Sequence, residues 1–216
     1  MKRITLFCGH YGSGKTNLAV NYALYLRRQG VPVAIGDLDI VNPYFRTKDS
    51  EAELREAGVD VIALPFANSS VDLPSLPAEA YTLVQNTDRY AVLDIGGDDR
   101  GAYALGRYVP AILKENNYDQ WFVVNFYRPL TPTPEAALEV LREIEQACGI
   151  PFTGIVNNSN LGEETAPEDV LATAERAEAL GRLTGLPVVM TAAKDTVCPQ
   201  LQREDAFPLQ LQKKYW

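Results

Sequence analysis

The sequence has little of what several common kinds of site require. It holds one histidine, His10, and three cysteines, Cys8, Cys148 and Cys198, which form no Cys-x-x-Cys pair. A histidine-based metal cage or a Ser-His-Asp triad therefore has little to work with, and neither a zinc site nor a disulfide framework is indicated. Such cysteine usage fits a reducing compartment, so we expect a cytoplasmic protein.

Excess basic charge and long apolar runs are also missing. The net charge is −8 at pH 7, whereas a surface that binds a nucleic-acid backbone needs clustered lysine and arginine. No stretch approaches the ~20 apolar residues of a membrane-spanning helix. The tail from 209 to 216 carries only two lysines and follows Pro208, unlike a basic amphipathic anchor. We expect neither direct nucleic-acid binding nor a membrane anchor.

What the sequence does have is a regular alternation of short apolar runs and helical patterns. The runs are continuously apolar, as two-sided burial in a parallel sheet requires. The expected strands cover residues 4–8, 33–37, 59–64, 91–94, 121–125, 153–157 and 188–190. No repeat or linker interrupts the pattern. Residues 1–216 are therefore predicted to form one α/β domain, with a mainly parallel seven-stranded sheet and helices on both faces.

Three helices have recognisable ends. The first follows residue 14, carries its apolar residues on one face and ends near Gly30. A second, short helix is expected after Ser50, which forms a capping-box pattern with Glu53. A third begins at Thr133 and Pro134. The proline-rich stretch 66–77 is expected to be a loop that can cover a site.

Residues 9–16 form a complete Walker A loop, Gly9-His10-Tyr11-Gly12-Ser13-Gly14-Lys15-Thr16. Its glycines let the backbone approach phosphate oxygens, and the free N–H groups at the start of the following helix favour an anion. Lys15 is placed to reach the β- and γ-phosphates, Thr16 to bind Mg²⁺, and Asn17 to lie beside the nucleotide. The strand before and the helix after make a chance match improbable. The loop predicts a P-loop NTPase that holds Mg-ATP.

Acidic residues follow two other strands, at the edge of a parallel sheet where ligands bind. Asp37 ends the second strand and Asp39 follows it; one can order the magnesium shell and the other can orient an attacking water. The alternative is a solvated loop end. Asp94 ends the fourth strand in the Walker B pattern, and Gly96 and Gly97 provide a backbone whose N–H can sense the γ-phosphate.

A run of asparagines ends the sixth strand. The Asn157 amide can both donate to and accept from a base edge. The sequence from Asn157 to Asn160 lacks the aspartate of the guanine-reading Asn-Lys-x-Asp motif, which favours ATP over GTP. The alternative is that Asn157 only caps the strand end.

These four segments, in this order, resemble those of the ParA/MinD/CobQ-like ATPases, which belong to the SIMIBI class and carry a deviant Walker A loop. The resemblance covers essentially the whole chain, although only the Walker loop is specific on its own. It implies ATP with Mg²⁺ and slow hydrolysis controlled by a protein partner or by homodimerisation. The roles it implies are phosphate and magnesium binding by Lys15, Thr16, Asp37 and Asp94, water orientation by Asp39 and an adenine contact by Asn157.

His10 departs from the family pattern. Deviant Walker loops have a lysine immediately after the first glycine, which reaches across a dimer to the partner's nucleotide. Histidine is shorter and only partly charged near neutral pH. His10 either hydrogen-bonds a phosphate or only packs against the loop. The absence of this lysine weakens the expectation of a dimer that holds the nucleotide between its two chains. It does not change the expectation that the loop binds ATP.

Three functions follow from these residues. The leading hypothesis is a partner-regulated ATPase switch, in which the loops at Asp39 and at Gly96 reorder with the nucleotide. The alternative is an ATP-dependent ligase that phosphorylates a carboxylate, with Arg128 as the anchor of the acid. The third is a nucleotide-dependent binding module that hydrolyses almost nothing.

Overall fold

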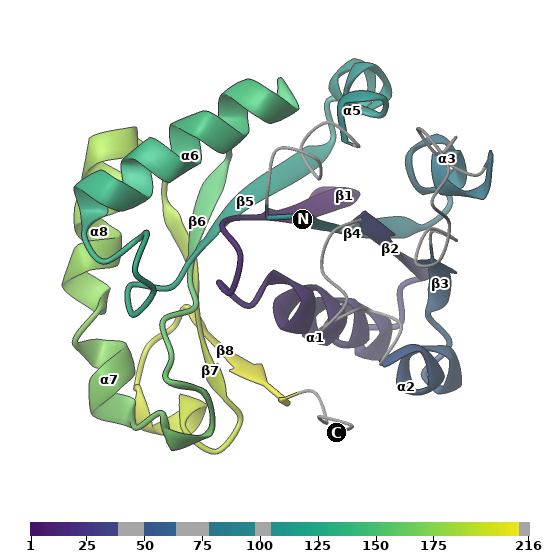
Figure 1. Cartoon of the computed structure of the whole chain (residues 1–216). Coiled ribbons are helices and arrows are strands. Elements are labelled where there is room, and N and C mark those ends of the chain that lie inside the picture. The colour runs from purple at the N-terminus through teal and green to yellow at the C-terminus, as the bar shows by residue number, and fades with distance from the viewer. Residues whose placement is uncertain (39–49, 64–77, 98–104, 212–216) are drawn as a thin grey trace, which may run out of the picture.

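The structure is a computed structural model that describes residues 1–38, 50–63, 78–97 and 105–211. These residues form a single sheet of eight strands in the order β3-β2-β4-β1-β5-β6-β7-β8 (Figure 1). Every pairing is parallel. The strands are β1 (Ile4–Cys8), β2 (Val33–Leu38), β3 (Asp60–Ala63), β4 (Tyr90–Ile95), β5 (Tyr118–Val124), β6 (Gly154–Asn157), β7 (Val188–Lys194) and β8 (Ala206–Leu209). The predicted α/β class and parallel sheet are confirmed.

Helices cover both faces of the sheet, as predicted (Figure 1). One face carries α1 (Lys15–Arg28) and α2 (Glu51–Glu56). The other carries α3 (Ala78–Gln85), α5 (Val109–Glu115), α6 (Pro134–Cys148) and α8 (Ala174–Thr184). The helix α7 (Pro167–Leu171) and the 3₁₀ helices η3 (Gly162–Glu164) and η4 (Cys198–Gln200) lie in the connections around β6 and β7. None of the described helices is long and apolar enough to cross a bilayer.

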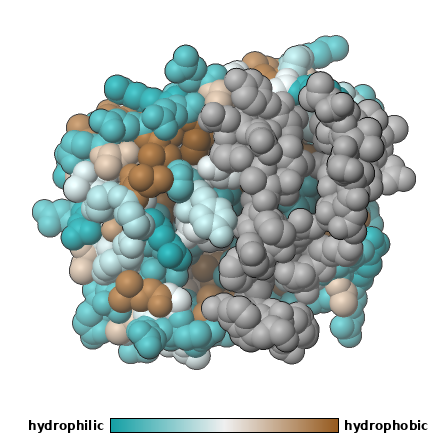
Figure 2. Space-filling view, in the orientation of Figure 1, coloured by the Kyte–Doolittle hydropathy of each residue, from teal (hydrophilic) through white to brown (hydrophobic). Residues whose placement is uncertain are grey.

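The core lies in two apolar layers, one on each face of the sheet. Strand β1 shows how the sequence fills both, because successive side chains of a strand point to opposite faces. Leu6 and Cys8 belong to the layer under α5 and α6. Phe7, between them, belongs to the layer under α1, where its ring contacts Tyr22 and Trp121 edge-on. Figure 2 shows mostly hydrophilic residues on the described part of one outer face, with apolar residues in small separate groups.

The eighth strand corrects the predicted count of seven. Strand β8 pairs with β7 at the edge of the sheet, with Thr191 opposite Ala206. It is short and contains Pro208, which an edge strand tolerates because one of its sides needs no N–H donor. Asn21 of α1 fixes its end: the Asn21 side chain donates to the Gln210 carbonyl at 3.0 Å and accepts from the Gln210 N–H at 2.9 Å. The last strand is thus tied to the helix that follows the Walker loop.

The predicted helix ends are confirmed except for one cap. Helix α6 starts after Thr133, whose hydroxyl accepts the Ala136 N–H at 3.3 Å, and ends at a left-handed Gly149. Helix α2 forms where expected, but the prediction of a capping box was wrong, since the Ser50 side chain makes no capping bond to it. The stretch 66–77 lies outside the described residues.

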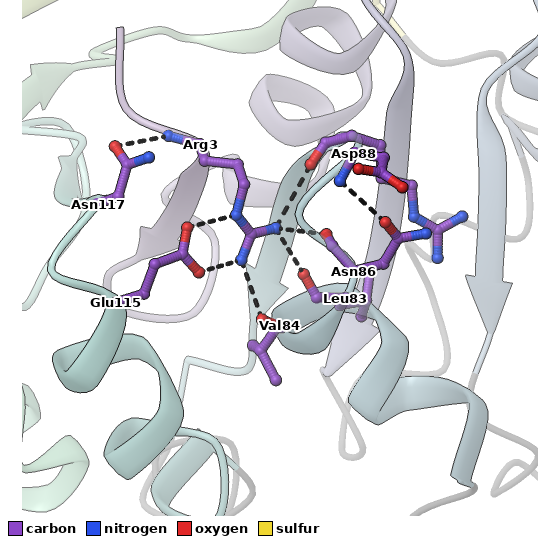
Figure 3. Close-up of polar contacts among 8 residues, drawn as sticks. Arg3, Leu83, Val84, Asn86, Asp88, Glu115 and Asn117 are labelled. Carbon is purple, nitrogen blue, oxygen red and sulfur yellow. Dashed lines mark hydrogen bonds and ion pairs between the residues drawn. The ribbon is translucent and has the colours of Figure 1, made fainter.

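Arg3 fixes the amino end of β1 through polar contacts (Figure 3), and its side chain is buried. Its guanidinium pairs with Glu115 at the end of α5. The same group donates to the carbonyl oxygens of Val84 and Asn86, each at 3.0 Å, at the end of α3. The backbone N–H of Arg3 donates to the Asn117 side chain at 3.2 Å. One side chain therefore joins the central strand to two helices of the same face.

We expect Arg3→Met to lower the free energy of unfolding by about 2–4 kcal/mol, because it leaves a largely buried carboxylate and several carbonyls without their donor. Urea denaturation followed by circular dichroism measures the change. The matched control is Arg55→Met: Arg55 pairs with Glu51 one helical turn away, and its side chain is 57% exposed, so its loss costs about 0.5 kcal/mol or less. Equal losses in the two variants would contradict the role given to Arg3.

Candidate functional site

The Walker loop connects β1 to α1 and is packed directly on its neighbours. A Cβ atom at Gly9 would lie 2.3 Å from the Val123 carbonyl oxygen of β5. A Cβ atom at Gly14 would lie 2.3 Å from Nδ2 of Asn158, at the end of β6. Gly14 has a φ of 88°, in the left-handed region. Only glycine fits these two places, so the close contact with β5 and β6 sets the shape of the loop.

The side chains that follow the loop are buried at the start of α1. Lys15 and Thr16 both belong to the first turn, and the N-cap residue, Gly14, has no side chain that could cap the helix. The amide N–H groups of an uncapped first turn favour an anion. The Lys15 ammonium donates to the His10 carbonyl at 3.3 Å, which holds the charge against the loop. This arrangement has the features expected of a phosphate cradle: free amide groups and one fixed cation.

His10 makes a local contact. Its Nδ1 atom lies 3.1 Å from the Tyr11 carbonyl oxygen. A carbonyl oxygen only accepts, so Nδ1 carries the proton in this contact. The imidazole is thereby oriented by its own loop, and Tyr11 beside it is 56% exposed. The role of His10 toward a phosphate stays a prediction.

Two of the predicted acids lie side by side. Asp37 of β2 and Asp94 of β4 are paired in register, and Asp94 is also paired with Phe7 of β1, one residue before the end of that strand. Asp94 is fully buried and Asp37 half-buried. Asp39 lies outside the described residues.

The donor set suits Mg²⁺ better than a metal held entirely by protein. Among the described residues, no group of three or more His, Cys, Asp and Glu side chains comes together. Magnesium binds oxygen ligands and usually keeps waters and phosphate oxygens alongside one or two carboxylates. The Thr16 hydroxyl and the carboxylates of Asp37 and Asp94 are the residues that would hold it.

Gly97 brings the segment after β4 into contact with the Walker loop. A Cβ atom there would lie 2.6 Å from the Tyr11 amide nitrogen and 3.0 Å from Nζ of Lys15. A side chain at this position would displace either the loop or the lysine. The backbone after Asp94 therefore touches the part of the site where the outer phosphates of a nucleotide would end.

The two asparagines after β6 differ in their surroundings. Asn157 is fully buried, and its amide contacts the hydroxyls of Thr173 at 3.0 Å and Ser159 at 2.7 Å. Asn158 instead donates to the Ser13 carbonyl at 2.7 Å and borders the cavity described below. Asn157 is not among the residues that line that cavity. The adenine contact given to Asn157 stays a prediction, and Asn158 is a residue that the sequence analysis missed.

A cavity of about 350 Å³ opens beside the Walker loop. Its lining combines the loop and the first turn of α1 with the ends of β6, β7 and β8. The residues are Tyr11, Gly12, Gly14, Lys15, Thr16, Asn17, Arg128, Asn158, Asn160, Gly162, Glu163, Thr165, Ala192, Ala193, Lys194, Leu209 and Leu211. The lining is polar and cationic at the loop and includes apolar side chains from β7 and β8, a combination typical of small-molecule sites.

Arg128 also lines the cavity, and its Nε donates to the Gly12 carbonyl at 2.9 Å. Sequence reasoning placed it near a carboxylate substrate. In the structure it lies against the Walker loop, more than a hundred residues away in the sequence. No local pattern signals such a contact.

Cys8, the last residue of β1, lies under the loop and beside Cys148. Burial raises the pKa of the Cys8 thiol well above its usual value; Cys148 and Asp94 add to the rise, and the Lys15 ammonium opposes it. The group is therefore a neutral thiol at pH 7. Both cysteines are buried.

No protein-family model matches the sequence, and no curated protein matches it. Solved structures of FtsY do share its fold. The cell division protein FtsY of Thermotoga maritima is 15% identical with a TM-score of 0.62, over 89% of this chain and 62% of that one. FtsY of Mycoplasma mycoides is 17% identical with a TM-score of 0.56, over 88% and 59%. Chloroplast FtsY of Physcomitrella patens is 18% identical with a TM-score of 0.58, over 88% and 58%.

The chain spans about three fifths of the length of these FtsY chains. At such low identity the likeness concerns the fold alone. The shared fold agrees with the predicted fold class, an α/β P-loop NTPase fold with a parallel sheet.

Proposed function

We propose that the protein is an Mg-ATP-binding P-loop ATPase of the ParA/MinD/CobQ-like type, whose nucleotide state is read by a protein partner or by a second copy of the chain. The observation that carries the proposal is the pairing of a Walker loop with a sensor beside it. The loop buries Lys15 in its cradle, and Gly97 touches both the loop and that lysine. Loss of the outer phosphate would therefore change the contacts of the backbone after β4 directly.

Each residue has a distinct task in this proposal. Lys15 and the amides of the first turn of α1 bind the phosphates, with Asn17 beside them. Thr16, Asp37 and Asp94 hold the magnesium ion, which neutralises phosphate charge when bound. Asp39 orients the attacking water. The contacts within the loop and the register of Asp37 with Asp94 support this assignment.

The cavity lining supports ATP over GTP. Reading guanine takes a carboxylate free to accept from the base, as in the Asn-Lys-x-Asp motif. The residues from Asn157 to Asn160, two of which line the cavity, include no such aspartate, and the acid among the described lining residues, Glu163, pairs with Lys194 at 2.8 Å. Asn160, which also lines the cavity, can donate to and accept from an adenine edge.

The ligase alternative stays a prediction. Its anchor, Arg128, lines the cavity, where the Arg128 Nε donates to the Walker loop. No other observation on the described residues favours it over the switch.

We expect Lys15→Ala to weaken Mg-ATP binding by about a hundredfold or more, because the fixed cation beside the phosphates is lost. Isothermal titration calorimetry measures the dissociation constant, and Lys114→Ala, on the exposed side of α5, is the charge-matched control. The same titration with GTP should give at least roughly tenfold weaker binding than ATP. Unchanged ATP affinity in Lys15→Ala would overturn the proposed function.

We expect Gly97→Ala to reduce ATP hydrolysis by roughly tenfold or more, equivalent to about 1.4 kcal/mol on the barrier. The added methyl would sit 2.6 Å from the Tyr11 amide and displace the sensor from the loop. Phosphate release measures the rate. Gly106→Ala is the matched control, because a Cβ there meets no atom of the described residues within 4 Å. Wild-type hydrolysis in Gly97→Ala would rule out a sensor at this position.

A further inference from the structure

Arg128 occupies a defined position beside the Walker loop. Its Nε donates to the Gly12 carbonyl at 2.9 Å. A Cβ atom built on Gly12 would lie 3.5 Å from Nε and 3.7 Å from Cζ, so the guanidinium lies in van der Waals contact with the loop. Among the described residues, no acceptor binds its two terminal nitrogens. The planar guanidinium therefore borders the cavity, and the N–H groups of its terminal nitrogens are available to a ligand there.

The turn that carries Arg128 is held on both sides. The Arg128 N–H donates to the Asn125 carbonyl at 3.1 Å, and the Thr131 N–H donates to the Arg128 carbonyl at 3.1 Å. Asn125 is fully buried, and its amide contacts the backbone of Asn160 after β6. The Tyr127 hydroxyl donates to the Asp169 carbonyl at 2.8 Å. The backbone of this arginine is therefore fixed before any ligand binds.

The contact with Gly12 shows which part of a nucleotide the guanidinium would meet. In a Walker loop the N–H groups converge on the phosphates, so a carbonyl such as that of Gly12 faces away from them. Because Arg128 donates to this carbonyl, its guanidinium lies beside the phosphate cradle, on the side of the loop that faces away from the phosphates. The strand that precedes its turn, β5, lies between the loop strand β1 and strand β6, on the way to the far end of the cavity.

The far end of the cavity suits an aromatic ring. Its apolar lining comes from Ala192 and Ala193 of β7, Leu209 of β8 and Leu211. Strand β7 lies three strands from β1 in the sheet, which is about 14 Å at the usual strand spacing. A nucleoside attached to phosphates in the Walker loop would have to cross this distance, and Arg128 lines the cavity on the way.

We propose that Arg128 binds the nucleoside part of the nucleotide, with its guanidinium plane stacked on the face of the base. The proposal rests on the proposed function, since it requires a nucleotide in the Walker loop. A guanidinium suits this task because it is planar, is weakly hydrated and stacks on aromatic rings, whereas a lysine ammonium is a compact, strongly hydrated point charge. Arg128 then contributes affinity for the base independently of the number of phosphates.

The test compares probes with and without a base. ADP is matched with pyrophosphate and ATP with tripolyphosphate, each titrated with Mg²⁺ by calorimetry. We expect Arg128→Met and Arg128→Lys each to weaken ADP and ATP by the same factor, about five- to tenfold, and to leave both baseless probes unchanged. Arg142→Met, on the exposed side of α6, controls for the loss of one positive charge.

Other results have equally definite meanings. Three results would assign Arg128 to the phosphates and overturn the proposal. They are a loss of affinity that is larger for ATP than for ADP, a loss of affinity for tripolyphosphate as well, and wild-type affinity in Arg128→Lys. Wild-type affinities in all Arg128 variants would also overturn it. Failure of the unmodified protein to bind ADP or ATP would instead overturn the proposed function, and Lys15→Ala, expected to lose all four probes, keeps the two failures apart.

Discussion

The close packing of the Walker loop on the ends of its neighbouring strands is the constraint on which the rest of the site depends. The loop passes so near β5 that a Cβ at Gly9 would lie 2.3 Å from the Val123 carbonyl oxygen. It passes equally near Asn158, whose side chain leaves no room for a Cβ at Gly14. The amide groups of the loop can converge on an anion only because these contacts keep its backbone from moving outward. Lys15 is held by the same geometry, through the His10 carbonyl.

Several distant parts of the chain meet at this loop. Asn158 donates to the Ser13 carbonyl, Arg128 donates to the Gly12 carbonyl, and Gly97 touches the Tyr11 amide. On the other side of α1, Asn21 holds the end of β8, whose Leu209 lines the cavity. A ligand in the loop would therefore act on three connections and on the last strand together. Such convergence is what a nucleotide switch requires, because a local change must reach a surface that a partner can read.

The sequence alone predicted the elements whose signals are local. The glycine spacing of the Walker loop, the apolar runs of the central strands and the cap at Thr133 each depend on neighbouring residues, and the structure has them. Strand β8 was missed because four residues including a proline carry almost no strand signal. Distant contacts stabilise it: the pairing with β7, the bonds to Asn21 and the packing of Phe207 on the tyrosines of α1.

The site was harder to predict than the fold because its contacts join distant residues. Asn157, the last residue of β6, is buried among hydroxyls, whereas the next residue, Asn158, contacts the loop. Side chains of a strand alternate between faces, so a one-residue error in register exchanges the two roles. Arg128 was singled out for its charge, but its position against Gly12 follows from the turn fixed by Asn125. No spacing in the sequence encodes that distance.

The most direct test of the central claim is a crystal structure of the protein with Mg²⁺ and a non-hydrolysable ATP analogue. The account predicts that the triphosphate lies along the amides of residues 12–17, with the Lys15 ammonium on its outer phosphates and the metal beside Thr16. A structure at millimolar analogue in which this loop stays empty, or in which the analogue binds elsewhere, would contradict it.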